Sequence, residues 1–276
     1  MRNAHLYGEL ERTYHELAEL DRMKSEFIAI ASHELRSPLA LVIGYTQMLR
    51  DRNEGQTREY AQRALEGATK ITQIVDDLTK LRQNDIQRPE LKRETVAIDG
   101  LVRQVIERLN DDAAQRAHTV TLQTPGDELI VAVERDKFLL MVGNLLSNAI
   151  TFTPPNGNIH VRLTVWRHAE LMRSVQAAAI NPSLRRLDTI HSGEWAIVEV
   201  YDTGIGIPRE HQSRIFERFY QVAHSLTRTH GGVGLGLALV AESIMHHQGL
   251  VWMEANTPQG SCFRLAIPLP AAATGL

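Results

Sequence analysis

Apolar residues recur at steps of three and four along the start of the chain. They are Leu6, Leu10, Tyr14, Leu17, Leu20, Met23, Phe27 and Ile30, and the apolar pattern continues past Leu35, Leu39, Val42 and Leu49. That spacing gives a helix one apolar stripe and leaves charged residues on its other face. The pattern breaks at residues 51–55 and resumes over residues 60–81, so it predicts a long helical hairpin.

Two helices cover only part of each other's apolar stripe. The hairpin is therefore predicted to dimerise into a four-helix bundle, in which four stripes enclose one core. The alternative is a single hairpin that packs on the C-terminal part of its own chain.

Beyond a polar linker at residues 83–89, runs of strand and helix composition alternate. The strand-like runs are residues 119–123, 129–133, 159–166, 195–201, 250–254 and 262–268. The helical runs are residues 98–115, 134–152 and 235–248, and Gly249 is suited to end the last of them. This alternation predicts an α/β layer domain over residues 91–270.

Residues 167–194 interrupt two of the strand-like runs. They contain a helical stretch at residues 169–180, which Asn181 and Pro182 end. We expect a tolerated surface insertion between two hairpin strands, with a dedicated docking element as the alternative.

Composition limits the classes of protein that remain. With 276 residues, 43% of them apolar and 23% charged, the chain can bury a core and fits two domains. Its 30 basic and 33 acidic residues give a net charge of −3, which argues against nucleic-acid binding. The single cysteine, Cys262, excludes an intrachain disulfide. Because no apolar run approaches about 20 residues and no signal peptide begins the chain, we expect a soluble protein of a reducing compartment.

His33 stands in a helical stretch, with Glu34 next to it and Pro38 five residues later. The proline cannot donate to the carbonyl of Glu34, so the helix is expected to bend one turn beyond His33. A histidine with an unperturbed pKa of about 6.5 is largely neutral and nucleophilic at pH 7. If the Glu34 carboxylate accepts the Nδ1 proton, Nε2 is left to attack. One such pair among 12 histidines is a weak signal by itself.

Two glycine clusters, at residues 202–207 and 232–237, carry a stronger signal. The first follows a strand and the second opens a helix, and neither matches a P-loop or the dinucleotide-binding pattern. Glycines at a helix entrance let backbone N–H groups approach a phosphate closely. Asp202, at a strand end, could accept a hydrogen bond from a purine amine. The alternative is two glycine-rich turns without a ligand.

Asn144 and Asn148 are four residues apart and so share one face of a helix. Amide oxygens suit Mg²⁺, which also retains phosphate oxygens and waters. The two residues could instead be helix caps or solvated side chains, but their apolar neighbours favour the edge of a pocket.

Five segments together resemble the H, N, G1, F and G2 boxes of the sensor histidine kinases. They are residues 32–38, 144–148, 202–206, 215–219 and 232–236, in the order of that family. The resemblance extends over roughly residues 17–268 and implies an α+β multidomain protein. It would consist of a coiled-coil signalling helix (1–22), a dimerisation and phosphotransfer hairpin (23–86) and an ATP-binding α/β sandwich with a mixed sheet (91–270).

The resemblance implies that His33 accepts the γ-phosphoryl group of ATP and that Glu34 polarises its ring. The residues implied to bind the nucleotide are Asn144, Asn148, Asp202, Gly204, Gly206, Phe216, Phe219, Gly232, Gly234, Leu235 and Gly236. Asn144 and Asn148 would hold Mg²⁺ and phosphates, and Asp202 would read the adenine amine. Residues 208–232 would form a lid over ATP, with Phe216 and Phe219 packing it against the hairpin.

Two positions depart from the family pattern. Thr151 stands where a basic residue is common, so a cation near the phosphates is lost unless Lys137, Arg228 or another basic residue replaces it. Ser37, four residues after His33, keeps a hydroxyl where Thr or Asn is linked to phosphatase activity, which leaves that second activity open.

The resemblance thus implies an ATP-dependent protein histidine kinase that phosphorylates His33 and passes the phosphoryl group to an aspartate of a response regulator. We expect a homodimer that receives its signal from an upstream sensor module in cis or in trans. It would be cytoplasmic, or tethered to a membrane through a segment outside these residues. One alternative is a degenerate ATP-binding scaffold, which Thr151 favours. The other is a chaperone- or repair-type ATPase, which the hairpin with His33 argues against.

Overall fold

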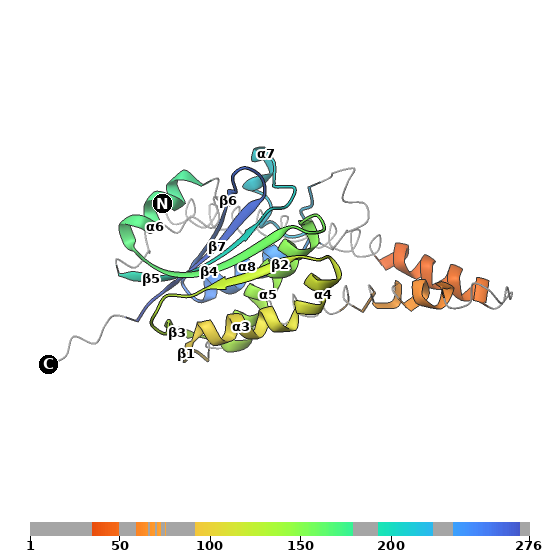
Figure 1. Ribbon diagram of the computed structural model, residues 1–276, viewed down its shortest axis with the longest axis horizontal. Helices are drawn as coiled ribbons and strands as arrows, with labels where there is room; N and C mark the ends of the chain where they lie inside the picture. The colour runs from red at the N-terminus through yellow and green to blue at the C-terminus, as the bar shows by residue number, and fades with distance from the viewer. Residues whose placement is uncertain are drawn as a thin grey trace, which may run out of the picture. The chain divides into compact units, whose positions relative to one another are not determined.

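The computed structural model describes part of the chain and divides it into two compact units. The described residues are 35–49, 59–65, 67–69, 71–72, 75, 92–178, 193–222 and 234–270. Those before residue 87 belong to a helical unit, and those from residue 92 onward belong to an α/β unit (Figure 1). A helical region followed by an α/β domain with a mixed sheet confirms the predicted fold class.

The helical unit is an antiparallel pair of helices. Residues 35–49 form one helix, and the described residues between 59 and 75 are also helical. A Cβ atom on Gly67 would lie 3.0 Å from the carbonyl oxygen of Pro38, so the backbones approach closely there. The rings of Tyr45 and Tyr60 are 5.9 Å apart. Because the residue number rises in one helix as it falls in the other across these contacts, the pair is the predicted hairpin.

The α/β unit is built on a five-stranded sheet. Its strands run in the order β2 (Thr119–Gln123), β4 (Asn158–Arg167), β5 (Glu194–Asp202), β7 (Ser261–Pro268) and β6 (Leu250–Ala255). Strands β2 and β4 are parallel and the other neighbours are antiparallel, so the sheet is mixed. A separate antiparallel pair joins β1 (Glu94–Ala97) to β3 (Ile130–Val133).

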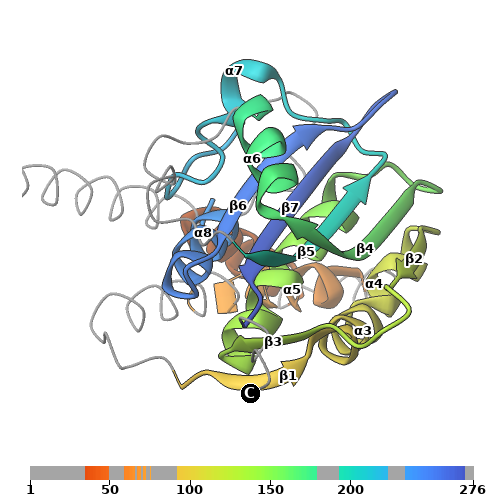
Figure 2. The ribbon, with the colours of Figure 1, turned by 90° about the vertical axis from the view of Figure 1, so that its left-hand side faces the viewer.

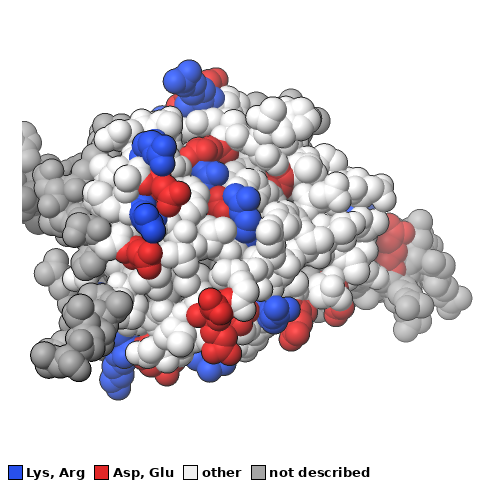
Figure 3. All heavy atoms as spheres, turned by 60° about the vertical axis from the view of Figure 1, so that its left-hand side comes forward, with Lys and Arg blue, Asp and Glu red and all other residues white. Residues whose placement is uncertain are grey.

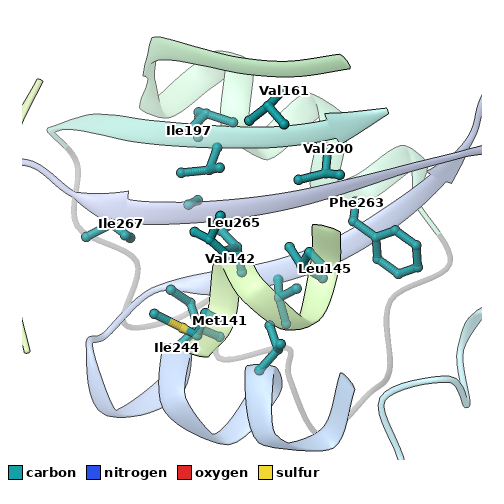
Figure 4. Packing of buried hydrophobic residues seen from close by; sticks show 14 of the residues in the cluster. Met141, Val142, Leu145, Val161, Ile197, Val200, Ile244, Phe263, Leu265 and Ile267 are labelled. Atoms are coloured by element: carbon teal, nitrogen blue, oxygen red, sulfur yellow. The ribbon is translucent and has the colours of Figure 1, made fainter. Parts of the chain in front are cut away.

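Helices cover one face of this sheet. Helices α5 (Arg135–Phe152) and α8 (Gly236–His246) pack on it, and α3 (Ile98–Arg108) packs beside α5 (Figure 1). Figure 4 shows side chains of α5, α8 and the strands meeting in this layer; they include Met141, Val142, Leu145, Ile244, Val200, Phe263 and Leu265. Alternate residues of each strand therefore face this core.

Two details differ from the predicted elements. The helical run predicted over residues 98–115 is broken at Leu109, after which α4 (Asn110–Gln115) begins with two acidic residues in its first turn. Acidic side chains stabilise a helix N-terminus, which favours a new start there. Strand β1 and the short α7 (Arg209–Gln212) were not predicted, and each is only four residues long.

The insertion lies between paired strands, as predicted, but its helix is part of the packed domain. Strands β4 and β5 pair as far as Arg167 and Glu194. Helix α6 (His168–Ala177) follows β4 directly and covers the sheet face opposite α5 and α8 (Figure 2). Its Leu171 and Val175 are buried, so this helix is more than a surface loop. Residues 179–192 of the insertion lie outside the described part.

Candidate functional site

Helix α5 carries the predicted asparagine pair on the edge of its buried face. Asn144 and Asn148 are half-buried, while Leu145 and Ala149 next to them face the core. The Nδ2 of Asn144 donates to the carbonyl of Leu140 at 2.9 Å, one turn earlier. That bond fixes the amide and leaves its Oδ1 as an acceptor.

The start of α8 meets this amide. A Cβ atom on Gly236 would lie 2.8 Å from Asn144 Oδ1, so the missing side chain makes room for the amide oxygen. The structure thus brings together two segments that are 92 positions apart in the sequence. An amide oxygen next to the N-terminus of a helix is a combination that suits a phosphate with its Mg²⁺.

The backbone conformation and close packing at position 234, just before α8, require a glycine. Its φ of +72° is unfavourable for other residues, and a Cβ there would lie 2.8 Å from the carbonyl carbon of Phe219. The N–H of Phe219 donates to the Gly234 carbonyl at 2.9 Å. Arg218 adds a 2.6 Å ion pair with Glu242 of α8. A hydrogen bond and an ion pair therefore hold the F-box segment against α8 and the residues just before it.

Asp202 ends β5 with a buried carboxylate that is 5% exposed. Its Oδ1 accepts the N–H of Gly204 at 2.8 Å and that of Ser261 at 3.1 Å. Burial raises the pKa of this carboxyl, and the two backbone N–H groups partly offset that effect. Among the described residues both bonds reach Oδ1, which leaves Oδ2 as an acceptor for a ligand.

The turn after Asp202 rests on the end of α5. A Cβ on Gly204 would lie 2.7 Å from the carbonyl oxygen of Phe152, and Ile205 N–H donates to that oxygen at 3.3 Å. Gly206 has a φ of +71°, which explains the second glycine. The Phe152 ring is 38% exposed beside this turn. Sequence reasoning missed this aromatic residue, although its position at the end of the Asn144 helix was a usable signal.

Phe216, in the F-box segment, packs against the sheet. Its ring is 6% exposed and lies edge-to-face with Phe263 of the sheet, with ring centroids 6.3 Å apart. This contact anchors the segment within the α/β unit, and the predicted packing of a lid against the hairpin stays a prediction. Nearby, the Tyr220 hydroxyl is 2.6 Å from His211 Nδ1, and the Arg214 guanidinium lies over the Tyr220 ring.

Several predicted site residues lie outside the described part of the chain. They are His33, Glu34 and Gly232, together with Arg228, one of the basic residues considered as a replacement at position 151. Ser37 is exposed near the start of the first described helix. Leu235 is buried, directly before Gly236.

Thr151 has a cation close to its backbone. The Arg116 guanidinium donates to the Thr151 carbonyl at 3.2 Å. Both residues border a polar pocket of about 200 Å³ between α4 and α5, which Ser147 and Asp112 also line. This volume is below the roughly 300–1,000 Å³ usual for ligand pockets. Lys137, the other replacement considered, lies in the first turn of α5 and is 3.6 Å from Glu134.

The described residues lack two other kinds of feature. Within those ranges, no three His, Cys, Asp or Glu side chains are grouped to bind a metal ion. No helix in the same part of the chain is long and apolar enough to cross a membrane.

Two family models match the chain. The model of the histidine kinase-, DNA gyrase B- and HSP90-like ATPases matches residues 133–271. The model of the His kinase A phospho-acceptor domain matches residues 23–85. The chain belongs to the histidine kinase family. The resemblance noted in the sequence is thereby confirmed, and His33 lies within the matched phospho-acceptor segment.

Curated histidine kinases align with nearly all of this chain. Hybrid signal transduction histidine kinase D of Dictyostelium discoideum is 32% identical over 264 residues, which cover 95% of this chain and 16% of that protein. The circadian input-output histidine kinase CikA of Synechococcus elongatus is 31% identical, with coverages of 89% and 30%. Sensor histidine kinase WalK of Bacillus subtilis is 27% identical, with coverages of 92% and 38%. This histidine kinase chain thus spans less than two fifths of the length of these relatives.

Solved histidine kinases share the fold. Histidine kinase AdeS of Acinetobacter baumannii has a TM-score of 0.61 at 20% identity and covers 86% of this chain and 98% of its own. Histidine kinase ThkA, solved with the response regulator protein TrrA, has a TM-score of 0.64 at 18% identity, with coverages of 91% and 64%. ShkA, solved with AMPPNP, has a TM-score of 0.59 at 22% identity, with coverages of 91% and 47%.

Proposed function

We propose that this chain is an ATP-dependent protein kinase that phosphorylates its own His33 and donates the phosphoryl group to an aspartate of a response regulator. The observation that carries the proposal is the convergence of Asn144 with Gly236, on the helix whose end supports the Asp202 turn. These segments would bind ATP in the unit that follows the phospho-acceptor segment.

Each end of the nucleotide would meet a different part of the site. Asp202 Oδ2 would accept a hydrogen bond from the adenine amine, with Gly204 and Gly206 lining the base and Phe152 offering an aromatic face. At the other end, the backbone N–H groups at the start of α8 would meet the phosphates. Asn144 and Asn148 would hold Mg²⁺, which neutralises phosphate charge when it is bound.

In the reaction, Nε2 of His33 would attack the γ-phosphorus of ATP. The bond from that phosphorus to the β–γ bridging oxygen breaks, ADP leaves, and the Nδ1 proton passes to the Glu34 carboxylate. The α/β unit contributes positioning and electrostatic stabilisation, which are the main requirements of phosphoryl transfer. The phosphohistidine would then give its phosphoryl group to a receiver aspartate, and Ser37 leaves a phosphatase activity towards that partner open.

The partners follow from the same account. ThkA is solved with a response regulator protein, which supports a receiver domain as the acceptor here. Large apolar side chains of the hairpin are exposed, and they are Leu39, Leu41, Ile43, Met48, Leu65 and Val75. A second hairpin would cover them in a homodimeric four-helix bundle. An upstream sensor module would act in cis or in trans, and the chain would work in the cytoplasm, free or tethered.

A second candidate is an ATP-binding scaffold without kinase activity, and Thr151 is the observation that favours it. To separate the two, the chain is incubated with Mg²⁺ and ATP labelled on the γ-phosphate. A kinase gives acid-labile, alkali-stable label on protein, and His33→Gln abolishes it while nucleotide binding persists. Nucleotide binding without label on the wild-type chain would support the scaffold and contradict the kinase.

A further inference from the structure

The C-terminus of α5 has a hydrogen-bond donor for each of its last carbonyls. The final carbonyls of a helix have no partner inside the helix and must find one elsewhere. Here the Ala149 carbonyl accepts the Thr153 N–H at 3.1 Å. The next carbonyls, of residues 150–154, accept donors from outside the helix.

Two side chains from the connection between α4 and β2 supply most of these donors. Arg116 Nη1 donates to the carbonyls of Ile150 and Thr151, at 3.5 and 3.2 Å. His118 Nε2 lies 3.1 Å from the carbonyl oxygens of both Thr153 and Pro154, so Nε2 carries a proton and donates. A guanidinium at this position also offsets the negative end of the helix dipole.

The backbone of the same connection binds the segment after α5. The Arg116 carbonyl accepts the N–H of Asn156 at 3.1 Å, and Thr119 N–H donates to the Gly157 carbonyl at 3.1 Å. Arg116 and His118 are thus held in place from both sides, and they define where α5 ends.

The one carbonyl in this group that neither side chain reaches is that of Phe152. It accepts the N–H of Ile205, in the turn that follows Asp202. The Gly204 N–H in that turn donates in its turn to Asp202 Oδ1. Two hydrogen bonds, together with the short stretch of backbone between Ile205 and Gly204, therefore connect the end of α5 to the carboxylate at the end of β5.

We propose that Arg116 and His118 are positioning residues for base recognition: by fixing the last turn of α5, they place Phe152 and, through it, the Asp202 carboxylate. The inference rests on the proposed function, in which Asp202 reads the adenine amine. Without Arg116, the carbonyls of Ile150 and Thr151 lose their donor, the last turn frays, and the Phe152 carbonyl no longer fixes the Asp202 turn.

The test compares Arg116→Met with Arg135→Met in the full chain. Arg135 lies at the opposite end of α5, is exposed, and donates to Gln104 at 3.2 Å, so it matches the change in charge and helix without touching the cap. Binding of fluorescent ATP is measured with unlabelled ATP and GTP as competitors. We expect Arg116→Met to lower the preference for ATP over GTP by about 3- to 10-fold and Arg135→Met to leave it unchanged.

Two variants of His118 test whether a hydrogen-bond donor at this position is enough to keep the preference for ATP. His118→Gln keeps an amide donor and should retain most of the preference for ATP, whereas His118→Leu should lose it as Arg116→Met does. If Arg116→Met or His118→Leu lowers only the thermal stability, or weakens ATP and GTP binding equally, the residues are structural and the proposal is overturned.

The proposed function fails by a different result. If the wild-type chain does not bind ATP, or if Asp202→Asn leaves the preference for ATP intact, adenine recognition by Asp202 is wrong. If the wild type prefers ATP and only Asp202→Asn removes that preference, the proposed function stands and the positioning role of Arg116 and His118 is refuted.

Discussion

The two faces of the five-stranded sheet use polar residues in opposite ways. On the side covered by α5 and α8, Asp202 and Asn144 lie at the ends or edges of elements and keep an oxygen available for a ligand. On the side under α6, the charged groups satisfy one another. Glu199, which is fully buried, pairs with Arg162 at 2.6 Å and with Arg264 at 2.7 Å.

The paired network extends into the insertion. Arg264 also pairs with Glu254, whose carboxylate accepts the Ser174 hydroxyl of α6 at 2.5 Å. The indole N–H of Trp252 donates to that hydroxyl at 3.1 Å. On the face that Figure 3 shows, acidic and basic side chains are interspersed and do not gather by sign. Buried polar groups that bind one another stabilise a fold, whereas buried polar groups with an unused hydrogen-bond donor or acceptor are suited to bind a ligand.

The largest expected effect is on ATP affinity, and it compares two residues of β5 that face opposite sides of the sheet. Asp202→Asn should weaken ATP binding by about 30- to 100-fold, because a charged acceptor for the adenine amine is lost. Nucleotide titration measures the change. Glu199→Gln, three residues earlier on the same strand but facing α6, serves as the control and should leave the affinity for ATP unchanged. Equal losses in both variants would contradict the division between the faces.

The converse prediction concerns stability. Glu199→Gln should lower the free energy of unfolding by about 2–3 kcal/mol, because two arginines lose their buried counter-charge while remaining partly solvated. Urea unfolding of both variants measures this, with Asp202→Asn expected to cost less. A Glu199→Gln chain as stable as the wild type would show that the network contributes little.

The pH dependence of stability has two sources on the two faces. Burial favours a raised pKa for Glu199, but hydrogen bonds from Arg162, Arg264 and Tyr201 outweigh burial and hold that pKa below its usual range. The stability contributed by this carboxylate is present above its unfolded pKa of about 4.3 and is lost as the pH falls through the lower folded pKa. In Glu199→Gln, the free energy of unfolding should therefore fall less steeply as the pH is lowered below about 4.3.

On the side covered by α5 and α8, protonation of His247 causes a separate change in stability at a pH nearer to neutrality. Its Nε2 accepts the Glu134 N–H at 3.0 Å, at the start of α5, while Nδ1 is 2.7 Å from the Ser243 carbonyl. Burial, reinforced by Arg93 and Lys137, lowers the pKa of this ring despite the opposing Ser243 carbonyl and Glu134 carboxylate. Stability is complete above the unfolded pKa of about 6.5 and falls below it, because the unfolded chain binds the proton first.

A variant isolates that transition. His247→Gln should cost about 1 kcal/mol at pH 7.5, through the altered hydrogen bonds, and should remove the fall in stability between pH 6.5 and the acid limb. Urea unfolding at several pH values tests it. A fall that persists unchanged in His247→Gln would assign it to another group.

The smallest effect is expected at the Arg218–Glu242 ion pair, whose side chains are 34% and 19% exposed. Each charge-reversed single variant should weaken ATP binding slightly, since the pair fastens the F-box segment to α8. The double reversal, Arg218→Glu with Glu242→Arg, should recover about 0.5 kcal/mol of coupling. Additive losses in the double variant would show that the pair itself contributes nothing.

The sequence could predict features that depend on neighbouring residues, but not contacts between residues far apart in the chain. Strand-like composition over residues 159–166 and 195–201 predicted β4 and β5, and the glycine clusters with the asparagine pair predicted the segments of the candidate site. The position of α6 on the sheet was not predictable, since Ser174 meets Glu254 80 residues later. The same holds for Arg116, whose role depends on carbonyls 34 and 35 residues away. The contact of Phe216 with Phe263 was likewise not predictable, because Phe263 lies 47 residues later in the sequence.

The central claim is that a nucleotide held by Asp202 and Asn144 phosphorylates His33. The wild-type chain and three variants are incubated with Mg²⁺ and γ-labelled ATP at a saturating concentration for the wild type, and acid-labile label on protein is measured over time. We predict rapid labelling of the wild type and of Glu199→Gln, none on His33→Gln, and strongly reduced labelling of Asp202→Asn. Label that persists on His33→Gln, or an Asp202→Asn chain labelled as fast as the wild type, would contradict the account.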